Sequence, residues 1–182
     1  CDYYSELAGK NYADMFPDEK HFYLNNRGNS YYYRGDYSTA IGYFRKVVEL
    51  VKDYPDMSWA LNLSYLNLSD CFLQLNKTDS VVKYLELCQP FFEELGSTTA
   101  LYYIDTQKIE LALQRKDFAE ARRLLTMSKA SPEIDADMIH IRNKYLQQFY
   151  EETGNYRQAY DCQKENKRLD DSVDLHTVAL AT

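Results

Sequence analysis

The sequence predicts an all-α protein built as a solenoid of antiparallel helix hairpins. Two features of composition favour helices: the 182 residues include only 6 Gly and 4 Pro, and few segments alternate strictly between apolar and polar residues. The third observation concerns the order of the residues, because one short motif recurs along the chain at nearly constant spacing. Each copy of this motif is expected to mark one helical hairpin.

The recurring motif is a polar turn of four residues, followed shortly by a small or β-branched apolar residue. The four turns are 34–37, 75–78, 115–118 and 153–156, and the apolar residues are Ala40, Val81, Ala121 and Ala159. Successive apolar residues of this set lie 41, 40 and 38 positions apart. Apolar residues also recur at helical intervals on both sides of the first turn, which indicates two amphipathic helices that meet there.

Single residues support the positions of the helix ends. Gly35 and Gly154 stand where a helix C-terminus commonly needs a left-handed residue. Ser131 and Pro132 predict an N-cap followed by Pro in the first turn of a helix. Pro90 lies inside a predicted helix and should kink or end it. The candidate N-caps of the second helices are Asp36, Thr78, Asp117 and Asn155.

These signals divide the chain into four hairpins with a partial element at each end. The predicted segments are 1–18, a helix of a preceding or capping hairpin; 19–55, 56–96, 97–130 and 131–171, the four repeats; and 172–182, the start of a C-terminal helix. The small residues Gly28, Ala40, Ser69 and Ala121 are expected to let helices approach closely. Phe44 is expected to fill the layer between hairpins.

Residues 23–50 resemble a tetratricopeptide repeat, and the other three repeats match this family more weakly. The matching residues are Asn26, Gly28, Asn29, Tyr31, Tyr32, Gly35, Asp36, Tyr37, Ala40, Ile41, Tyr43, Lys46, Glu49 and Leu50. The spacing of 38 to 41 residues exceeds the family's usual repeat of about 34 residues, so longer helices are expected. The resemblance implies a right-handed superhelical solenoid. It also implies a bacterial tetratricopeptide protein, because residues 154–173 resemble the last repeat of such proteins.

The resemblance also implies a binding site on the first helix of each hairpin, since those helices line the concave face in tetratricopeptide proteins and contact extended peptides. The expected contact residues are Asn25, Asn29, Tyr32, Tyr33, Asp70, Gln74, Glu110, Gln114, Lys144 and Gln148. Asn can hydrogen-bond a peptide backbone, and Tyr can stack or donate a hydrogen bond. The alternative is that these residues only face solvent. The Lys-rich clamp for a C-terminal carboxylate, known in chaperone-binding relatives, is not reproduced.

Charge and motifs argue against several other functions. The net charge of −7 opposes contact with a nucleic-acid backbone, and no apolar stretch approaches the roughly 18 residues of a membrane span. His21, His140 and His176 lack metal-ligand spacing, and no phosphate loop, nucleophile elbow or kinase motif is present. We therefore expect no catalytic residue, metal or cofactor. Cys71 and Cys88 could face each other, but two buried free thiols are the favoured interpretation.

The sequence thus predicts a non-catalytic scaffold that binds a protein or peptide, with its oligomeric state left open. One alternative is the sensor portion of a bacterial membrane-bound signalling or transcription regulator. Another is a lipid-anchored assembly factor, because bacterial lipoproteins begin at a lipidated Cys and this sequence begins at Cys1. A hydrolase or transferase would instead need a deep pocket with convergent titratable groups. A periplasmic or cell-envelope location is favoured over the cytoplasm.

Overall fold

The computed structural model describes residue 9 and residues 12–127 and 134–179, and it contains no strand among them. The elements are the 3₁₀ turn η1 (Tyr12–Asp14), α2 (Pro17–Tyr33), α3 (Tyr37–Val51), the 3₁₀ turn η2 (Pro55–Met57), α4 (Ser58–Gln74), α5 (Thr78–Leu95), α6 (Thr98–Gln114), α7 (Phe118–Met127), α8 (Ala136–Glu152) and α9 (Tyr156–Ala179). The predicted all-α class is confirmed.

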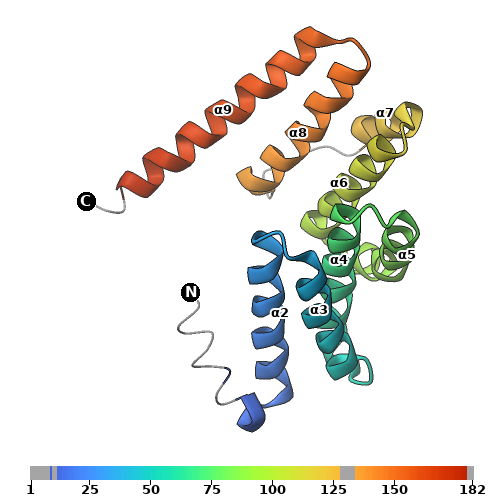
Figure 1. Ribbon diagram of the computed structural model, residues 1–182, viewed down its shortest axis with the longest axis vertical. Helices are drawn as coiled ribbons and strands as arrows, with labels where there is room; N and C mark the ends of the chain where they lie inside the picture. The colour runs from blue at the N-terminus through green and yellow to red at the C-terminus, as the bar shows by residue number, and fades with distance from the viewer. Residues whose placement is uncertain (1–8, 10–11, 128–133, 180–182) are drawn as a thin grey trace. The chain divides into compact units, whose positions relative to one another are not determined.

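The helices pack as antiparallel pairs within two compact units, residues 1–96 and residues 97–182. In the first unit α2 packs on α3 and α4 on α5, and α3 also packs on α4. In the second unit α6 packs on α7 and α8 on α9, and α6 also contacts α8 (Figure 1). Each pair is a helical hairpin of the predicted kind. The right-handed superhelix and the repeat boundaries stay predictions.

The same turn closes all four hairpins, although its sequence varies. One residue in each turn has a positive φ: Gly35 (77°), Asn76 (55°), Lys116 (59°) and Gly154 (77°). In each turn the amide of this residue donates to the carbonyl three positions earlier, and the next amide donates to the carbonyl five positions before it, at 2.7–3.2 Å. These paired bonds define a Schellman motif, which satisfies the last carbonyls of the first helix.

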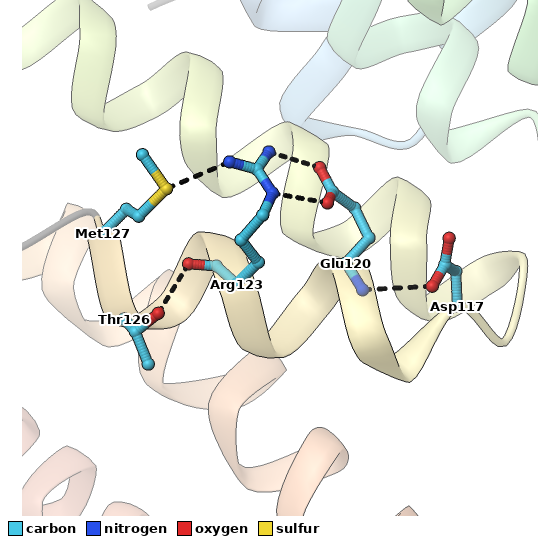
Figure 2. Close-up of polar contacts among 5 residues, drawn as sticks. All are labelled: Asp117, Glu120, Arg123, Thr126 and Met127. Atoms are coloured by element: carbon cyan, nitrogen blue, oxygen red, sulfur yellow. Dashed lines mark hydrogen bonds and ion pairs between the residues drawn. The ribbon is translucent and has the colours of Figure 1, made fainter.

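Two of the four predicted N-caps make the expected hydrogen bond. The Asp36 carboxylate accepts from the Thr39 amide at 3.1 Å at the start of α3. The Asp117 carboxylate accepts from the Glu120 amide at 3.0 Å at the start of α7, a contact that Figure 2 shows. Both carboxylates therefore satisfy one of the amides that have no partner inside the helix.

The other two predicted N-caps behave differently. Thr78 is the first residue of α5 and not its cap, because Lys77 occupies the position that Asp36 and Asp117 hold in their turns. Asn155 holds the equivalent position before α9, and its side-chain Nδ2 donates to the Thr153 hydroxyl at 3.0 Å. The prediction for Thr78 was wrong by one residue.

Pro90 does not end the helix that contains it. Helix α5 continues through Pro90 to Leu95 and stops at Gly96, which has φ 65°. The turn that follows Pro90 is held by packing, because Phe92 is fully buried and its ring lies 5.5 Å from that of Trp59. This burial offsets the hydrogen bond that Pro cannot donate.

The N-terminal end of the described chain differs from the predicted helix over 1–18. Phe16 has extended geometry, with φ −70° and ψ 158°, as expected for the residue before a Pro. Helix α2 therefore begins at Pro17, and η1 precedes it as a separate turn. Residues 1–8, 10 and 11 lie outside the described part of the chain.

Helix α9 passes through position 172 and ends at Ala179. Residues 172–179 thus continue α9 and do not start another helix, and the sequence between Leu169 and Val173 contains no Gly or Pro that would interrupt it. Residues 180–182 lie outside the described part. Ser131 and Pro132 also lie outside it, and α8 begins at Ala136 after Asp135.

The core of each unit lies between its helices, at the positions of the small and large residues that the sequence singled out. In residues 1–96, Ala40 and Ser69 are fully buried, and Phe44 is among the largest fully buried side chains. In residues 97–182, Ala121 packs in a cluster with Phe149. These contacts fix the faces that each helix leaves exposed.

Candidate functional site

Two of the predicted contact residues on α2 hold helices together. The Asn25 side-chain oxygen accepts a hydrogen bond from Asn67 Nδ2 of α4 at 3.1 Å. The Tyr32 ring is partly buried against the core of the first repeat and lies 5.4 Å from the Tyr37 ring. Because both side chains make internal contacts, their loss would disturb packing as well as any binding surface.

Asn29 and Tyr33 are the more accessible predicted residues of α2. Asn29 is half-buried, whereas Tyr33 is 85% exposed. The Tyr33 ring contacts only the edge of the neighbouring Tyr32 ring, at 5.6 Å between centroids, among the described ring contacts. Tyr33 thus presents a large aromatic surface to solvent.

Helix α4 places its two predicted residues in different surroundings. Asp70 is only 6% exposed, so its carboxylate does not lie on the accessible surface. The Gln74 side chain is half-buried and donates from Nε2 to the Asp70 carboxylate at 3.5 Å. The structure therefore places Asp70 in the interior and not on the solvent-facing side of α4, because α4 is buried on more than one face.

In residues 97–182 the predicted residues are more exposed. Gln114, Lys144 and Gln148 are exposed and Glu110 is half-buried. Gln114 donates to Glu110 at 3.4 Å, and Gln148 donates to Glu152 at 2.7 Å. Lys144 lines a pocket of about 400 Å³ between α8 and α9. These polar side chains form the accessible first-helix face of this unit.

The structure also contains a pocket that the sequence did not reveal. It has a volume of about 530 Å³ and lies within residues 97–182, with walls from α6, α7, α8 and the start of α9. None of the ten predicted contact residues lines it. Its described lining includes two arginines, Arg122 and Arg142, and no Asp or Glu.

Arg142 of α8 forms the buried wall of this pocket, with 5% of its surface exposed. Its Nε donates to the Thr106 hydroxyl at 2.9 Å, and its Nη2 donates to the Tyr102 carbonyl at 2.5 Å. The guanidinium carbon lies 3.3 Å from the centroid of the Tyr102 ring. Burial lowers the pKa of Arg142, and the nearby Tyr102 and Asp105 oppose this effect.

Arg122 of α7 supplies the second positive charge. Its side chain is exposed, and its guanidinium carbon lies 5.8 Å from the centroid of the Phe149 ring. Arg123, the next residue, is engaged elsewhere: it contacts Glu120 at 2.6 and 2.7 Å and the Met127 sulfur at 3.0 Å (Figure 2). The two neighbouring arginines therefore have different surroundings.

One signal in the sequence could have pointed to the buried arginine. Ile139, Arg142, Leu146 and Phe149 follow one another at helical spacing in α8, so a charged residue interrupts an apolar stripe. A charge at such a position needs partners in the interior. The sequence could not identify those partners, because Tyr102 and Thr106 lie 40 and 36 residues earlier.

The described residues show no group of three or more His, Cys, Asp or Glu that could hold a metal ion. His140 Nδ1 lies 3.0 Å from the Asp170 carboxylate. Cys71 and Cys88 are buried thiols that are not joined to each other by a disulfide, as the favoured interpretation of the sequence expected. None of the described helices has the length and apolar character that a membrane span requires.

Comparison with known proteins agrees with a helical-repeat architecture. A family model described as "Tetratricopeptide repeat" matches residues 21–54. The chain therefore carries a tetratricopeptide repeat, formed by α2 and α3, and the resemblance noted at residues 23–50 is confirmed. No curated protein matches the chain.

The solved structure of BtubC (BKLC) from P. vanneervenii is similar to the chain, with a TM-score of 0.67 and 16% sequence identity. The match covers 93% of this chain and 74% of that protein. This similarity is one of fold, because function lies in sites that differ between proteins of one fold.

Proposed function

We propose that the chain is a non-catalytic scaffold that binds another protein or a peptide through the exposed first-helix faces of its hairpins. The observation that carries this proposal is the tetratricopeptide repeat at residues 21–54, which stands in a chain of helix hairpins. Repeat proteins of this architecture use an extended face as a binding surface.

On α2, Asn29 and Tyr33 are the residues that best fit a binding role. The exposed Tyr33 ring can bury a large apolar area and still donate a hydrogen bond. Asn29 can donate and accept hydrogen bonds with a peptide backbone. Asn25 and Tyr32 contribute mainly to packing, because their contacts lie within the unit.

The other residues of the proposed binding surface are the accessible ones of the later first helices. They are Gln74 on α4, Glu110 and Gln114 on α6, and Lys144 and Gln148 on α8. No described feature favours the sensor or the lipid-anchored alternative over a scaffold.

Affinity capture from an extract of the cells that make this protein tests the proposal. The bait is the full chain, compared with an Asn29→Ala, Tyr33→Ala double variant and with Tyr54→Ala as a control. Tyr54 is also exposed, at 54%, but it lies between α3 and η2 and not on a first helix.

A partner that Tyr54→Ala retains and the double variant loses would support the proposed surface, provided that circular dichroism shows all baits folded. A partner retained by both variants would overturn the surface but not the scaffold. The absence of any partner of the wild-type chain would overturn the scaffold itself.

A further inference from the structure

We propose that the pocket between α8 and α9 binds a phosphorylated side chain of the protein partner, with the phosphate held by lysines from both helices. This inference rests on the proposed scaffold function and adds a chemical feature of the partner. It extends the first-helix surface at Lys144 onto α9. It follows from the charge, the residue types and the walls of the pocket.

The charge of this pocket is opposite to that of the whole chain. The sequence has a net charge of −7, yet the described lining of the pocket has three lysines, Lys144, Lys164 and Lys167, and one carboxylate, that of Asp170. The Asp170 carboxylate lies 3.0 Å from Nδ1 of His140, which also lines the pocket. A cleft lined by one sign of charge attracts ligands of the other sign, so the pocket favours an anion.

The three lysines are available to a ligand. All three are exposed, and in the described part of the chain none of them makes an ion pair or a hydrogen bond through its side chain. Arg168 on the same helix differs, because its Nη2 and Nε donate to the Glu165 carboxylate at 2.7 and 2.9 Å. The lysine ammonium groups can therefore turn toward a ligand without breaking an internal contact.

The lysines of the two helices line one cavity. Lys164 and Lys167 are three residues apart on α9, so their side chains are neighbours on the helix surface, and Lys144 comes from α8. Asn166 is 7% exposed, and its Nδ2 donates to the His140 carbonyl at 3.2 Å. This bond joins α9 to α8 at the level of the pocket, so the two walls are already in place before a ligand binds.

The residue types favour a phosphate over a carboxylate. The described lining contains no Arg, the residue whose planar fork matches the two oxygens of a carboxylate. A Lys ammonium is instead a point charge with three rotatable donors. Several such charges can contact different oxygens of one phosphate, and a phosphorylated side chain supplies three acceptor oxygens and a charge of about −1.5 to −2 at pH 7.

The remaining walls suit a phosphate that is attached to a peptide. Tyr160 is 64% exposed and offers an aromatic ring with a hydroxyl group. Gln163 is exposed and supplies an amide that can bond a peptide backbone. The volume of about 400 Å³ lies within the range of typical ligand pockets. It can hold a phosphorylated side chain together with part of the backbone that carries it.

Fluorescence polarisation with labelled octapeptide mixtures of blocked ends tests this inference on the full chain. One mixture carries phosphoserine at the fifth position, with mixed residues at all other positions. Two matched mixtures carry Ser or Glu at the fifth position. Inorganic phosphate, added as a competitor, tests whether the anion alone accounts for binding.

Lys164→Gln and Lys167→Gln each remove one cation from the α9 wall, and Lys144→Gln removes the cation of α8. Arg157→Gln is the matched control, because Arg157 is an exposed cation of α9 that does not line the pocket. Each variant changes the net charge by the same amount, so a general electrostatic effect would appear in all four. Thermal unfolding checks that each variant is folded.

We expect the phosphoserine mixture to bind the wild-type chain about 10-fold tighter than the Ser mixture, or more, and also tighter than the Glu mixture. Each Lys variant should lose about 3- to 10-fold in affinity for the phosphoserine mixture, and Arg157→Gln should bind as the wild type does.

Several results would overturn the inference. They are equal binding of the Ser mixture, equal or tighter binding of the Glu mixture, an equal loss in Arg157→Gln, and no binding of any mixture. Inorganic phosphate that competes at the same concentration as the unlabelled phosphoserine mixture would also overturn it, because the peptide would then add nothing to the affinity of the anion.

Capture from cell extract, with and without phosphatase treatment, separates a failure of this pocket from a failure of the scaffold. A natural partner that the wild-type chain captures equally from both extracts, and that the Lys164→Gln, Lys167→Gln double variant retains, would overturn the phosphate site and leave the scaffold intact. A wild-type chain that captures no partner from either extract would overturn the scaffold and, with it, this inference.

Discussion

The Phe44 ring fills the space that a side chain on Gly28 would need. A Cβ placed on Gly28 would lie 2.5 Å from Phe44 Cε1 and 2.8 Å from Cζ. Phe44 is itself 1% exposed, so its ring has no room to move toward solvent. The two helices of the tetratricopeptide repeat, α2 and α3, therefore approach each other at a position that only Gly allows.

Gly28→Ala should destabilise the protein by about 1–3 kcal/mol, because the added methyl group overpacks the contact with Phe44. The higher helix propensity of Ala reduces this loss by up to about 1 kcal/mol. Urea denaturation followed by circular dichroism measures the change. Phe44→Leu in the same chain should recover part of the loss, since a smaller side chain leaves room for the methyl group.

Gly42→Ala is the matched control for this substitution. Gly42 lies inside α3, and apart from its two chain neighbours and the nearby backbone of its own helix, no atom lies within 4 Å of the position of an added Cβ. The substitution should stabilise the protein by about 0.5–1 kcal/mol through helix propensity alone. If both glycine variants shifted the unfolding midpoint in the same direction, the argument from the Phe44 contact would be wrong.

The sequence predicted the repeat and much of its packing because these depend on local patterns. Gly35 and Gly154 indicated two of the turns in the sequence. Asn76 and Lys116 adopt the same left-handed conformation, although neither is Gly, the residue type that usually indicates it. For these two turns, only the spacing between repeats indicated that their geometry matches that of the turns at Gly35 and Gly154.

The candidate sites were harder to predict than the fold. Asp70 was placed on a surface from its position in the repeat, yet it is buried together with Asn62, Ser64 and Ser69 of the same helix. The Arg142 pocket needs Tyr102 and Thr106 from another helix. A period of about 40 residues places hairpins in order, but it does not fix the rotation of each helix about its axis, which decides such contacts.

Lys116 tests the cost of a left-handed residue that is not Gly. Its φ is 59°, and its ammonium pairs with the Glu152 carboxylate at 2.6 Å. Lys116→Gln removes the ion pair and keeps the Cβ, whereas Lys116→Gly removes both. We expect the Gly variant to be more stable than the Gln variant by about 1 kcal/mol, because a Cβ is unfavourable in this conformation.

Differential scanning calorimetry of the two Lys116 variants measures this difference. Because neither variant has the ion pair, its loss cancels in the comparison. Asn76→Gly should increase the stability of the protein by less than the difference between the Gln and Gly variants at position 116, since Asn tolerates positive φ better than most residues. Equal stability of the Gln and Gly variants would show that the turn at Lys116 carries no strain.

Pro90→Ala should stabilise α5. Ala restores the amide that can donate to the Glu86 carbonyl and removes the clash of the Pro ring with that carbonyl. The gain in helix stability, roughly 3 kcal/mol for an ideal helix, is reduced by about 1 kcal/mol because Ala is freer than Pro in the unfolded chain. We expect a net gain of about 1–2 kcal/mol in urea denaturation, and an unchanged or lower stability would contradict it.

Cys71 should make the stability of the protein fall at alkaline pH. Burial raises the pKa of this thiol from 9.0 to about 12, with a smaller contribution from Asp70. Between these two values the folded protein keeps the thiol proton and the unfolded chain releases it. The unfolded state is therefore favoured as pH rises, and this group contributes a loss of about 1.4 kcal/mol per pH unit above pH 9.

Urea denaturation between pH 7 and pH 11 of the wild-type chain and of Cys71→Ala measures this contribution. Cys71→Ala should be less stable at pH 7, because it leaves a small cavity at a fully buried position. Its stability should nevertheless fall less steeply above pH 9, since it lacks the titrating thiol. The raised pKa values of Tyr65 and Tyr102 affect both proteins and cancel in the comparison. If the stability of both proteins fell equally steeply above pH 9, the Cys71 thiol would ionise alike in the folded and unfolded states. Such a result would contradict the effect expected from the burial of Cys71 in α4.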